Sequence, residues 1–513
     1  MVKKSDLIKK YISLLFYFCF TAVSGFILVL SILRPQNHLF PWQMAVGTVL
    51  VTVAFCAVGI FWNRVYEKTY KGHGKKAWDI AFPVLLFLFW AGLYAIGLLH
   101  GDHHPTGDYE ILFASAVETA EGKELTYRNY FLVYGNNTEP MLLLAAVIRI
   151  CRFFKINEFP VLLLLSSGLV PGSVLAVKSL LPQNTGRKWA IPLTLFFFLC
   201  LPVYVFTPNF YTDTMSFGLG VIALAFFKIA FGEREKTVKP ILFAVLAALF
   251  TALGTAVKIT SVIPLIAAFL VFFLSSGRKP DKKYIKPAVA GILGFGIFFL
   301  VMHLYFSSFS VYGDSKKLSN PTISWIALGM REDGSYAKNV EFSDTLNAIT
   351  DPDAKAEYVK GYMKEHVSEA FSPKHIADKV QHNFAGGTFT GSDFTAKGER
   401  EAILYELMDP GGKYYWRTSQ ITFCYVALIY AMYVFGGVTG ILLLIRGTKL
   451  SFVKFTADLA FFGIFVFLMI WEANNRQLYN QVPILITALF CNLELFIGLI
   501  SKIRNSGKKT EEK

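Results

Sequence analysis

The chain has 513 residues, of which 54% are hydrophobic and 16% aromatic, and its mean hydropathy is +0.47. Only 17% of the residues are charged, against roughly 25% in soluble proteins, so the composition excludes an ordinary soluble domain and indicates a polytopic membrane protein. A net charge of +14 would suggest nucleic-acid binding in a soluble chain. In a membrane protein it predicts Lys- and Arg-rich cytoplasmic loops, so we expect no nucleic-acid partner.

Apolar stretches of about 20 residues, long enough to span a bilayer as helices, recur along the whole chain. The basic N-terminus leads into the first of them, which is too long for a signal-peptide core and is interpreted as a retained helix. The sequence predicts an all-α membrane protein with about twelve transmembrane helices. Their expected positions are 11–33, 41–62, 78–99, 159–181, 189–207, 213–231, 240–257, 260–275, 286–306, 420–445, 453–471 and 481–500.

The sidedness of the loops follows from their charge, because loops rich in Lys and Arg are usually cytoplasmic. Such loops occur at 63–76, 177–188, 231–239, 276–286 and 446–449, and the C-terminal tail is also basic. These loops share one side only if the short apolar segment 141–150 does not span. We therefore expect 140–155 to lie along the outer membrane surface, and both termini to be cytoplasmic.

Three regions follow from this topology. Residues 1–306 form an N-terminal transmembrane module whose outer loop, 100–158, is the expected catalytic loop. Residues 307–418 form a small extracytoplasmic domain, in which 353–382 is predicted to be helical with a break at Pro373. Residues 419–513 carry the last helices and the basic cytoplasmic tail.

The long outer loop carries the first candidate acids, Asp102 and Asp108. They are either solvated loop residues or a general base held at the membrane surface, and Asp108 is expected near the N-terminus of a helix. His103 and His104 are surface histidines, substrate contacts or metal ligands. Because adjacent histidines point in different directions, a metal site built on this pair is disfavoured.

Two further segments place polar residues at the same membrane face. Asp213, in PNFYTDT, is either a helix cap or a second acid of the site, with Tyr211 as a neighbouring donor. Lys258 interrupts a long apolar run, so it either reaches toward the membrane surface or binds a ligand. A compact cation near the outer interface suits a phosphate.

The last polar segment, WEANNRQLYNQVP (471–483), is expected to place Glu472, Arg476 and Tyr479 on neighbouring faces of a starting helix. Glu472 and Arg476 are spaced i,i+4 and could form a simple ion pair. The alternative is that Arg476 binds a lipid phosphate through its planar guanidinium, with Glu472 and Tyr479 as substrate contacts.

Taken together, these segments resemble the GT-C superfamily of membrane glycosyltransferases. The likeness is closest to multi-spanning transferases of Gram-positive bacteria, and more distant to protein O-mannosyltransferases and the aminoarabinose transferase of lipid A. It covers nearly the whole chain and rests on the order and sidedness of the motifs. The chain departs from the family at YGNN, where Gly135 replaces the proline of a YPN-type stretch. The motifs that carry the resemblance are TGDYEILFASA, YFLVYGNNTEP (130–140), PNFYTDT, AVKIT, PTISWIALGMREDGSY (321–336) and WEANNRQLY.

The resemblance implies an inverting hexosyltransferase that uses a polyprenyl-phosphate-linked sugar as donor. It also implies no metal site and no required cofactor, with a divalent metal as the alternative. Asp108, with Asp102 as the alternative, would deprotonate a hydroxyl of a cell-envelope acceptor, and Lys258 and Arg476 would bind the donor phosphate. The remaining substrate contacts would be Tyr211, Asp213, His103, His104, Glu472 and Tyr479. A transporter or flippase of lipid-linked sugars is the rival function, and it would place its ionisable residues near the bilayer midplane. A non-catalytic scaffold is a second rival.

Overall fold

The computed structural model describes residues 4–35, 40–70, 74–99, 107–232, 239–275, 282–385, 406–407 and 411–511. Within these ranges the chain is helical and forms no strand; one isolated β-bridge pairs Ser335 with Ala473. The predicted all-α class is confirmed for this part of the chain.

Ten helical segments are long and apolar enough to cross a membrane among the described residues. They lie at ten of the twelve predicted positions. They are α1 (Lys4–Leu33), α2 (Pro41–Tyr70), α3 (Lys75–Leu99), α7 (Glu158–Leu180), α10 (Thr212–Met215) with α11 (Leu219–Phe231), α12 (Lys239–Val257), η3 (Lys282–Tyr284) with α14 (Ile285–Ser307), α21 (Tyr415–Ile445), α22 (Phe452–Ile470) and η7 (Asn475–Gln481) with α23 (Val482–Glu511).

The other two predicted spans are shorter helices. The 189–207 region divides into α8 (Gln183–Phe198) and α9 (Pro202–Phe206), and Pro202 is the first residue of the second piece, a position that proline favours. The 260–275 region consists of η2 (Ile259–Val262) and α13 (Ile263–Ser275), and the backbone of Lys258 separates it from α12.

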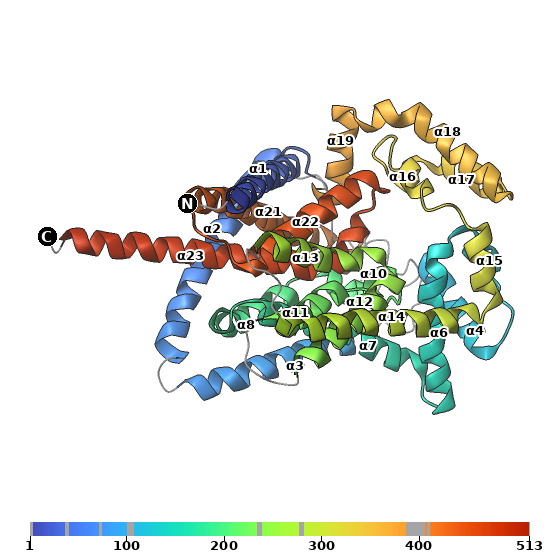
Figure 1. Ribbon diagram of the computed structural model, residues 1–513, viewed down its shortest axis with the longest axis horizontal. Coiled ribbons are helices and arrows are strands. Elements are labelled where there is room, and N and C mark those ends of the chain that lie inside the picture. The colour runs from blue at the N-terminus through green and yellow to red at the C-terminus, as the bar shows by residue number, and fades with distance from the viewer. Residues whose placement is uncertain are drawn as a thin grey trace.

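The outer loop folds into α4 (Asp108–Glu121), α5 (Arg128–Val133), η1 (Gly135–Asn137) and α6 (Thr138–Phe153). The 16-residue α6 packs on α4 and is not among the candidate spans. In Figure 1 it runs across the ends of the long helices instead of alongside them. Its position agrees with an interfacial helix at 140–155. The first residues of α1 and the last residues of α23 lie at the opposite end of the molecule (Figure 1).

The segment after α14 forms a cap with its own small core. Ala327, Leu328, Phe342, Leu346 and Val359 make a hydrophobic cluster separate from that of the long helices. The predicted helical break is confirmed, since α18 ends at Ala370 and Pro373 begins α19. The elements are α15 (Ser310–Leu318), α16 (Ser324–Leu328), η4 (Tyr336–Lys338), α17 (Val340–Ala348), α18 (Pro352–Ala370), α19 (Pro373–Val380) and η5 (Gln381–Ala385).

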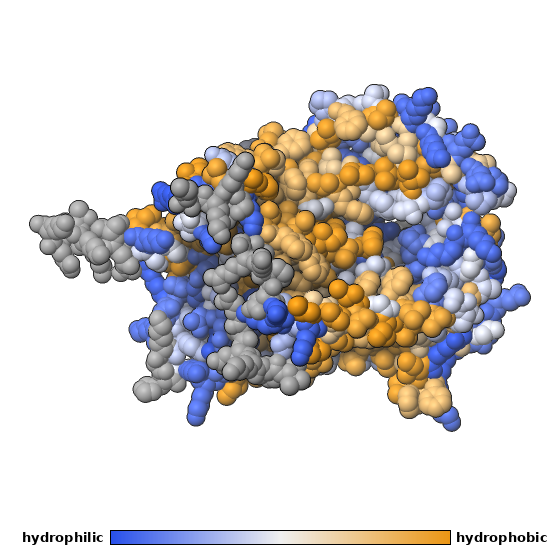
Figure 2. Space-filling model, in the orientation of Figure 1, coloured by the Kyte–Doolittle hydropathy of each residue, from blue (hydrophilic) through white to orange (hydrophobic). Residues whose placement is uncertain are grey.

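The surface of the long helices is apolar. Figure 2 shows an orange region over their middle, whereas the cap and the α4–α6 end carry many more hydrophilic residues, mixed with apolar ones. Large side chains such as Phe61 and Ile292 are 66% and 73% exposed on these helices, which would be unfavourable in water. This is the surface that a lipid bilayer requires.

Candidate active site

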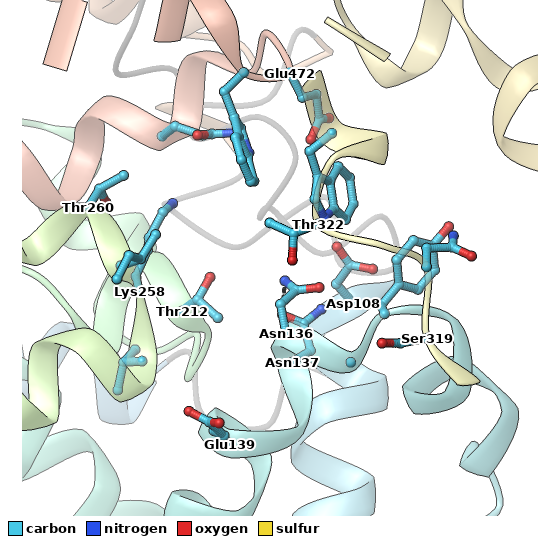
Figure 3. Close-up of a pocket in the computed structure, with 18 of the residues that line it drawn as sticks. Asp108, Asn136, Asn137, Glu139, Thr212, Lys258, Thr260, Ser319, Thr322 and Glu472 are labelled. Atoms are coloured by element: carbon cyan, nitrogen blue, oxygen red, sulfur yellow. Dashed lines mark hydrogen bonds between the residues drawn. The ribbon is translucent and has the colours of Figure 1, made fainter. Parts of the chain in front are cut away.

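A cavity of about 830 Å³ lies where the cap meets the ends of the long helices. Its wall is drawn from α4, the α5–η1 segment, α10, the α12–η2 break, the 319–336 segment and the 471–477 segment. Figure 3 shows the side chains of Asp108, Asn137, Lys258, Thr322 and Glu472 around this hollow. Six of the residues predicted from the sequence line it: Asp108, Tyr211, Asp213, Lys258, Glu472 and Arg476.

Asp108 is the first residue of α4, directly after Gly107, whose φ of 67° is unfavourable for other residues. Its Oδ1 accepts a hydrogen bond from the Tyr130 hydroxyl at 3.0 Å, and its Oδ2 accepts one from the Tyr211 hydroxyl at 3.1 Å. Arg476 Nη2 lies 3.2 Å from Oδ2. A carboxylate offers about four lone-pair positions, so these three donors leave room for one more hydrogen bond.

The two tyrosines are held as donors. Burial raises the pKa of the Tyr130 and Tyr211 hydroxyls well above the usual value, and the negative charge of Asp108 raises both further. Arg476 and Asn137 act in the opposite direction on Tyr211. Asn137 Nδ2 donates to the Tyr130 hydroxyl at 2.6 Å. The phenolic protons therefore stay in place and fix the position of the Asp108 carboxylate.

Asp213 joins the two predicted phosphate ligands. Its side chain is 1% exposed, its Oδ1 is ion-paired with Lys258 Nζ, and its Oδ2 lies 3.7 Å from Arg476 Nε. The guanidinium of Arg476 also covers the ring of Tyr211, with 5.0 Å between its central carbon and the ring centroid. Two cations and two carboxylates thus form one connected cluster on the helix side of the cavity.

The chain around Lys258 is fixed by the segment that follows Arg476. Lys258 has extended φ/ψ of −158° and 115° between α12 and η2. Asn480 Nδ2 donates to the Thr260 hydroxyl at 3.1 Å, and Gln481 Nε2 donates to the Thr260 carbonyl at 3.1 Å. Because both donors belong to η7, which also carries Arg476, the break at Lys258 is tied to the element that holds Arg476.

Glu472 lines the same cavity but has a different environment. Its side chain belongs to a residue that is 8% exposed, and no described residue hydrogen-bonds to it or forms an ion pair with it. Burial raises the pKa of this carboxyl to about 7, although Arg476 and Lys258 oppose the shift. The expected i,i+4 pair with Arg476 is absent from the described structure, because 471–474 is extended and η7 begins only at Asn475.

The cap holds the segment that carries Glu472. Ala473 N donates to the Gly334 carbonyl at 2.8 Å, and Asn474 N donates to Asn383 Oδ1 at 3.0 Å. A side chain at Gly329 would collide with the Trp471 carbonyl oxygen, so this glycine permits the close approach. The cap therefore sets the position of one wall of the cavity.

Of the other predicted site residues, Tyr479 does not line the cavity. Tyr479 is 1% exposed and its ring stacks on Phe206 at 4.0 Å, so it packs in the interior and is not positioned as a substrate contact. Asp102, His103 and His104 lie outside the described residues. No cluster of three or more potential metal ligands occurs within the described ranges.

Several cavity residues were not singled out from the sequence. Tyr130, Asn136 and Asn137 lie in the YFLVYGNNTEP stretch, and Trp325 and Tyr336 lie in the 321–336 segment. The signal that could have found them was the density of aromatic and amide side chains in two outer segments.

The comparison with protein families matches residues 5–494 to a single family model, described as "Conserved hypothetical integral membrane protein". The chain belongs to this family. The match covers both the transmembrane helices and the cap, so the family includes the whole cavity described above. No curated protein and no solved structure matches the chain. The family assignment supports an integral membrane protein, and its description states no reaction.

Proposed function

We propose that the protein is an inverting membrane glycosyltransferase that transfers a sugar from a polyprenyl-phosphate donor to an acceptor hydroxyl at the outer membrane face. The observation that carries the proposal is the cluster of Asp108, Asp213, Lys258 and Arg476 in one cavity at the ends of apolar helices. A carboxylate and two cations are the groups that such a transfer needs, and a lipid-borne phosphate would reach this level of the membrane.

In the proposed reaction, Asp108 uses its remaining lone-pair position to accept the proton of the acceptor hydroxyl. The acceptor oxygen attacks the anomeric carbon from the face opposite the phosphate. The bond between the anomeric carbon and the phosphate oxygen breaks, and the electron pair leaves with polyprenyl phosphate. The configuration at the anomeric carbon is thereby inverted.

Lys258 and Arg476 would stabilise the charge that develops on the leaving phosphate. Asp213 keeps both cations in position and compensates their charge when no donor is bound. A bound donor phosphate would then replace Asp213 and Asp108 in part of the contacts that these two carboxylates make with Lys258 and Arg476.

We also propose the GT-C-like topology of twelve crossings, with both termini cytoplasmic. The α8–α9 segment leads from Lys188, which pairs with Glu494 of α23, to Tyr211 at the cavity. The η2–α13 segment leads back from Lys258 toward Tyr284, whose ring packs on Phe231 at 6.2 Å. Both short segments thus connect opposite ends of the bundle.

Incubation of the purified protein with a labelled polyprenyl-phosphate sugar and cell-envelope material would test the proposal. We expect release of polyprenyl phosphate together with a glycosylated product of inverted configuration. Asp108→Asn should strongly reduce the rate of product formation, while Asp314→Asn, which removes a carboxylate paired with Arg128 outside the cavity, should not.

One feature of the structure would also fit the rival function, a flippase of lipid-linked sugars. This feature is the ionisable Lys258 at a break between two apolar helices. The rival function differs in its products. A flippase would move the intact donor between leaflets of a proteoliposome without releasing polyprenyl phosphate, and that result would replace the transferase proposal.

A further inference from the structure

Part of the cavity wall is lined by aromatic rings. Tyr134, Trp325, Tyr336 and Trp471 all line the cavity, and we refer to these four residues as the aromatic wall. Three of them belong to the outer segments and the fourth ends α22. The rings of Tyr134 and Trp325 lie 6.1 Å apart with a 32° angle between their planes, so they form a nearly continuous surface.

Neutral hydrogen-bonding groups adjoin the aromatic wall. Asn136, Ser319 and Thr322 line the cavity and are drawn around its hollow in Figure 3. Lys316, which also lines this side, is paired with Glu139 at 2.9 Å. The aromatic wall and its neighbours thus offer flat apolar surface together with amide and hydroxyl groups.

Glu472 adds an acceptor that the protein itself does not use. Its carboxyl belongs to a residue that is 8% exposed, it lines the cavity beside Trp471, and no described residue hydrogen-bonds to it. A buried polar group normally has a partner, so an unpaired carboxyl in a cavity wall indicates a ligand that donates hydrogen bonds.

A sugar ring matches this combination of groups. One face of a hexose presents C–H groups that pack on an aromatic ring, and its edge presents hydroxyls that both donate and accept. A polyprenyl chain would instead need aliphatic surface. The charged cluster of Asp108, Asp213, Lys258 and Arg476, where the proposed donor phosphate would bind, adjoins the aromatic wall. Tyr130 donates to Asp108 at 3.0 Å, and its ring lies 5.0 Å from that of Tyr134.

We propose that the aromatic wall and Glu472 form a saccharide-binding subsite, so that the acceptor is a glycan. The inference rests on the proposed transfer reaction and deepens it by naming the acceptor class. The acceptor ring packs on Trp325 or Trp471, Glu472 accepts one of its hydroxyls, and the hydroxyl to be glycosylated points toward Asp108.

Glycan binding can be measured without the donor. The probe is a panel of soluble oligosaccharides of neutral hexoses, N-acetylhexosamines and uronic acids, added to the full chain in lipid nanodiscs. Saturation-transfer NMR and tryptophan fluorescence report binding. We expect at least one class to bind at millimolar concentration or below, through its ring C–H groups.

Substitutions inside and outside the subsite test whether glycan binding depends on these residues. Trp325→Ala should weaken glycan binding about three- to tenfold, as expected for one aromatic contact. The isosteric Glu472→Gln should also weaken glycan binding. This second variant tests the subsite even if Trp325→Ala fails to fold. Trp416→Ala removes an indole that is 44% exposed and does not line the cavity, and it should bind glycans like the parent chain.

Absence of binding to every glycan in the panel would overturn the subsite, as would binding that survives both Trp325→Ala and Glu472→Gln. Preferential binding of poly(glycerol phosphate) that is insensitive to Trp325→Ala would overturn it too. Glycan binding without any sugar transfer or donor-phosphate binding would instead contradict the proposed function and leave the subsite standing.

Discussion

Arg476 Nη2 lies 3.2 Å from Asp108 Oδ2, although 368 positions separate the two residues in the chain. The contact joins the first residue of α4 to the 3-10 helix that precedes α23. It places a candidate base and a candidate phosphate ligand within one interaction. The α4 end of the outer loop and the last apolar helix must therefore pack together for the proposed site to exist.

The first prediction concerns the base. Asp108→Asn keeps the size and shape of the side chain but removes the negative charge, and it replaces one of the two oxygens that accept from Tyr130 and Tyr211 with an amide donor. We expect the transfer rate to fall about 10²- to 10⁴-fold, the usual contribution of a general base. The rate is measured as labelled polyprenyl phosphate released over time. Full activity of this variant would exclude Asp108 as the base.

The second prediction concerns the buried ion pair of Asp213 and Lys258. Asp213 is 1% exposed, so Lys258→Met leaves a buried carboxylate without its main partner. We expect a loss of about 3–5 kcal/mol in the free energy of unfolding, and a smaller loss when Asp213→Asn is combined with it. Thermal unfolding in detergent measures both. Equal losses in the single and double variants would show that the charges are not coupled.

The third prediction uses the carboxyl of Glu472, whose pKa burial raises from 4.5 to about 7. Between these values the folded protein binds more protons than the unfolded chain, so Glu472 lowers stability progressively as the pH rises from about 4.5 to about 7. Glu472→Gln removes this dependence. The unfolding temperature of Glu472→Gln minus that of the parent chain should therefore increase as the pH rises from about 4.5 to about 7. A difference that stays constant with pH would show that the carboxyl is not buried as described.

The fourth prediction tests the close packing at Gly135, the residue that departs from the YPN-type pattern. A Cβ at this position would lie 2.6 Å from Ser319 Oγ and 2.8 Å from Ser319 Cβ. Gly135→Ala should therefore destabilise the protein by about 1–3 kcal/mol and disturb the Asn136–Asn137 wall. The control is Gly361→Ala in α18, where nothing lies within 4 Å, and it should stabilise the helix by up to about 1 kcal/mol.

The sequence identified the parts of the site whose position depends on local patterns. Asp108 at a helix start, Lys258 at a break in an apolar run and Pro373 at the start of a helix are all set by neighbouring residues. The apolar runs likewise predicted where ten long helices lie.

Contacts between distant segments could not be predicted in this way. The sequence spacing of Glu472 and Arg476 suggested a pair, but the cap pulls 471–474 into an extended conformation and Arg476 turns to Asp108 and Asp213. Tyr479 was predicted to be a substrate contact because it was expected to share the start of a helix with Glu472 and Arg476. Its ring is instead drawn into the interior by stacking on Phe206, which is 273 positions away.

The last prediction concerns the sidedness of the site. The α4–α6 end and the cap lie together in Figure 1, away from the end of the molecule where α1 begins. If α6 does not span, an even number of crossings separates Lys123 from Ser368, and both face outward; if it spans, they face opposite sides. Single cysteines at Lys123 and Ser368 should therefore both react with a membrane-impermeant thiol reagent on intact cells, whereas cysteines at Asn184 and Lys282 should react only after lysis. The parent chain gives the background from its own six cysteines. Labelling of only one of the first two positions would mean that α6 crosses the membrane, and the basic loops would then lie on both sides, against the tendency that predicted the topology.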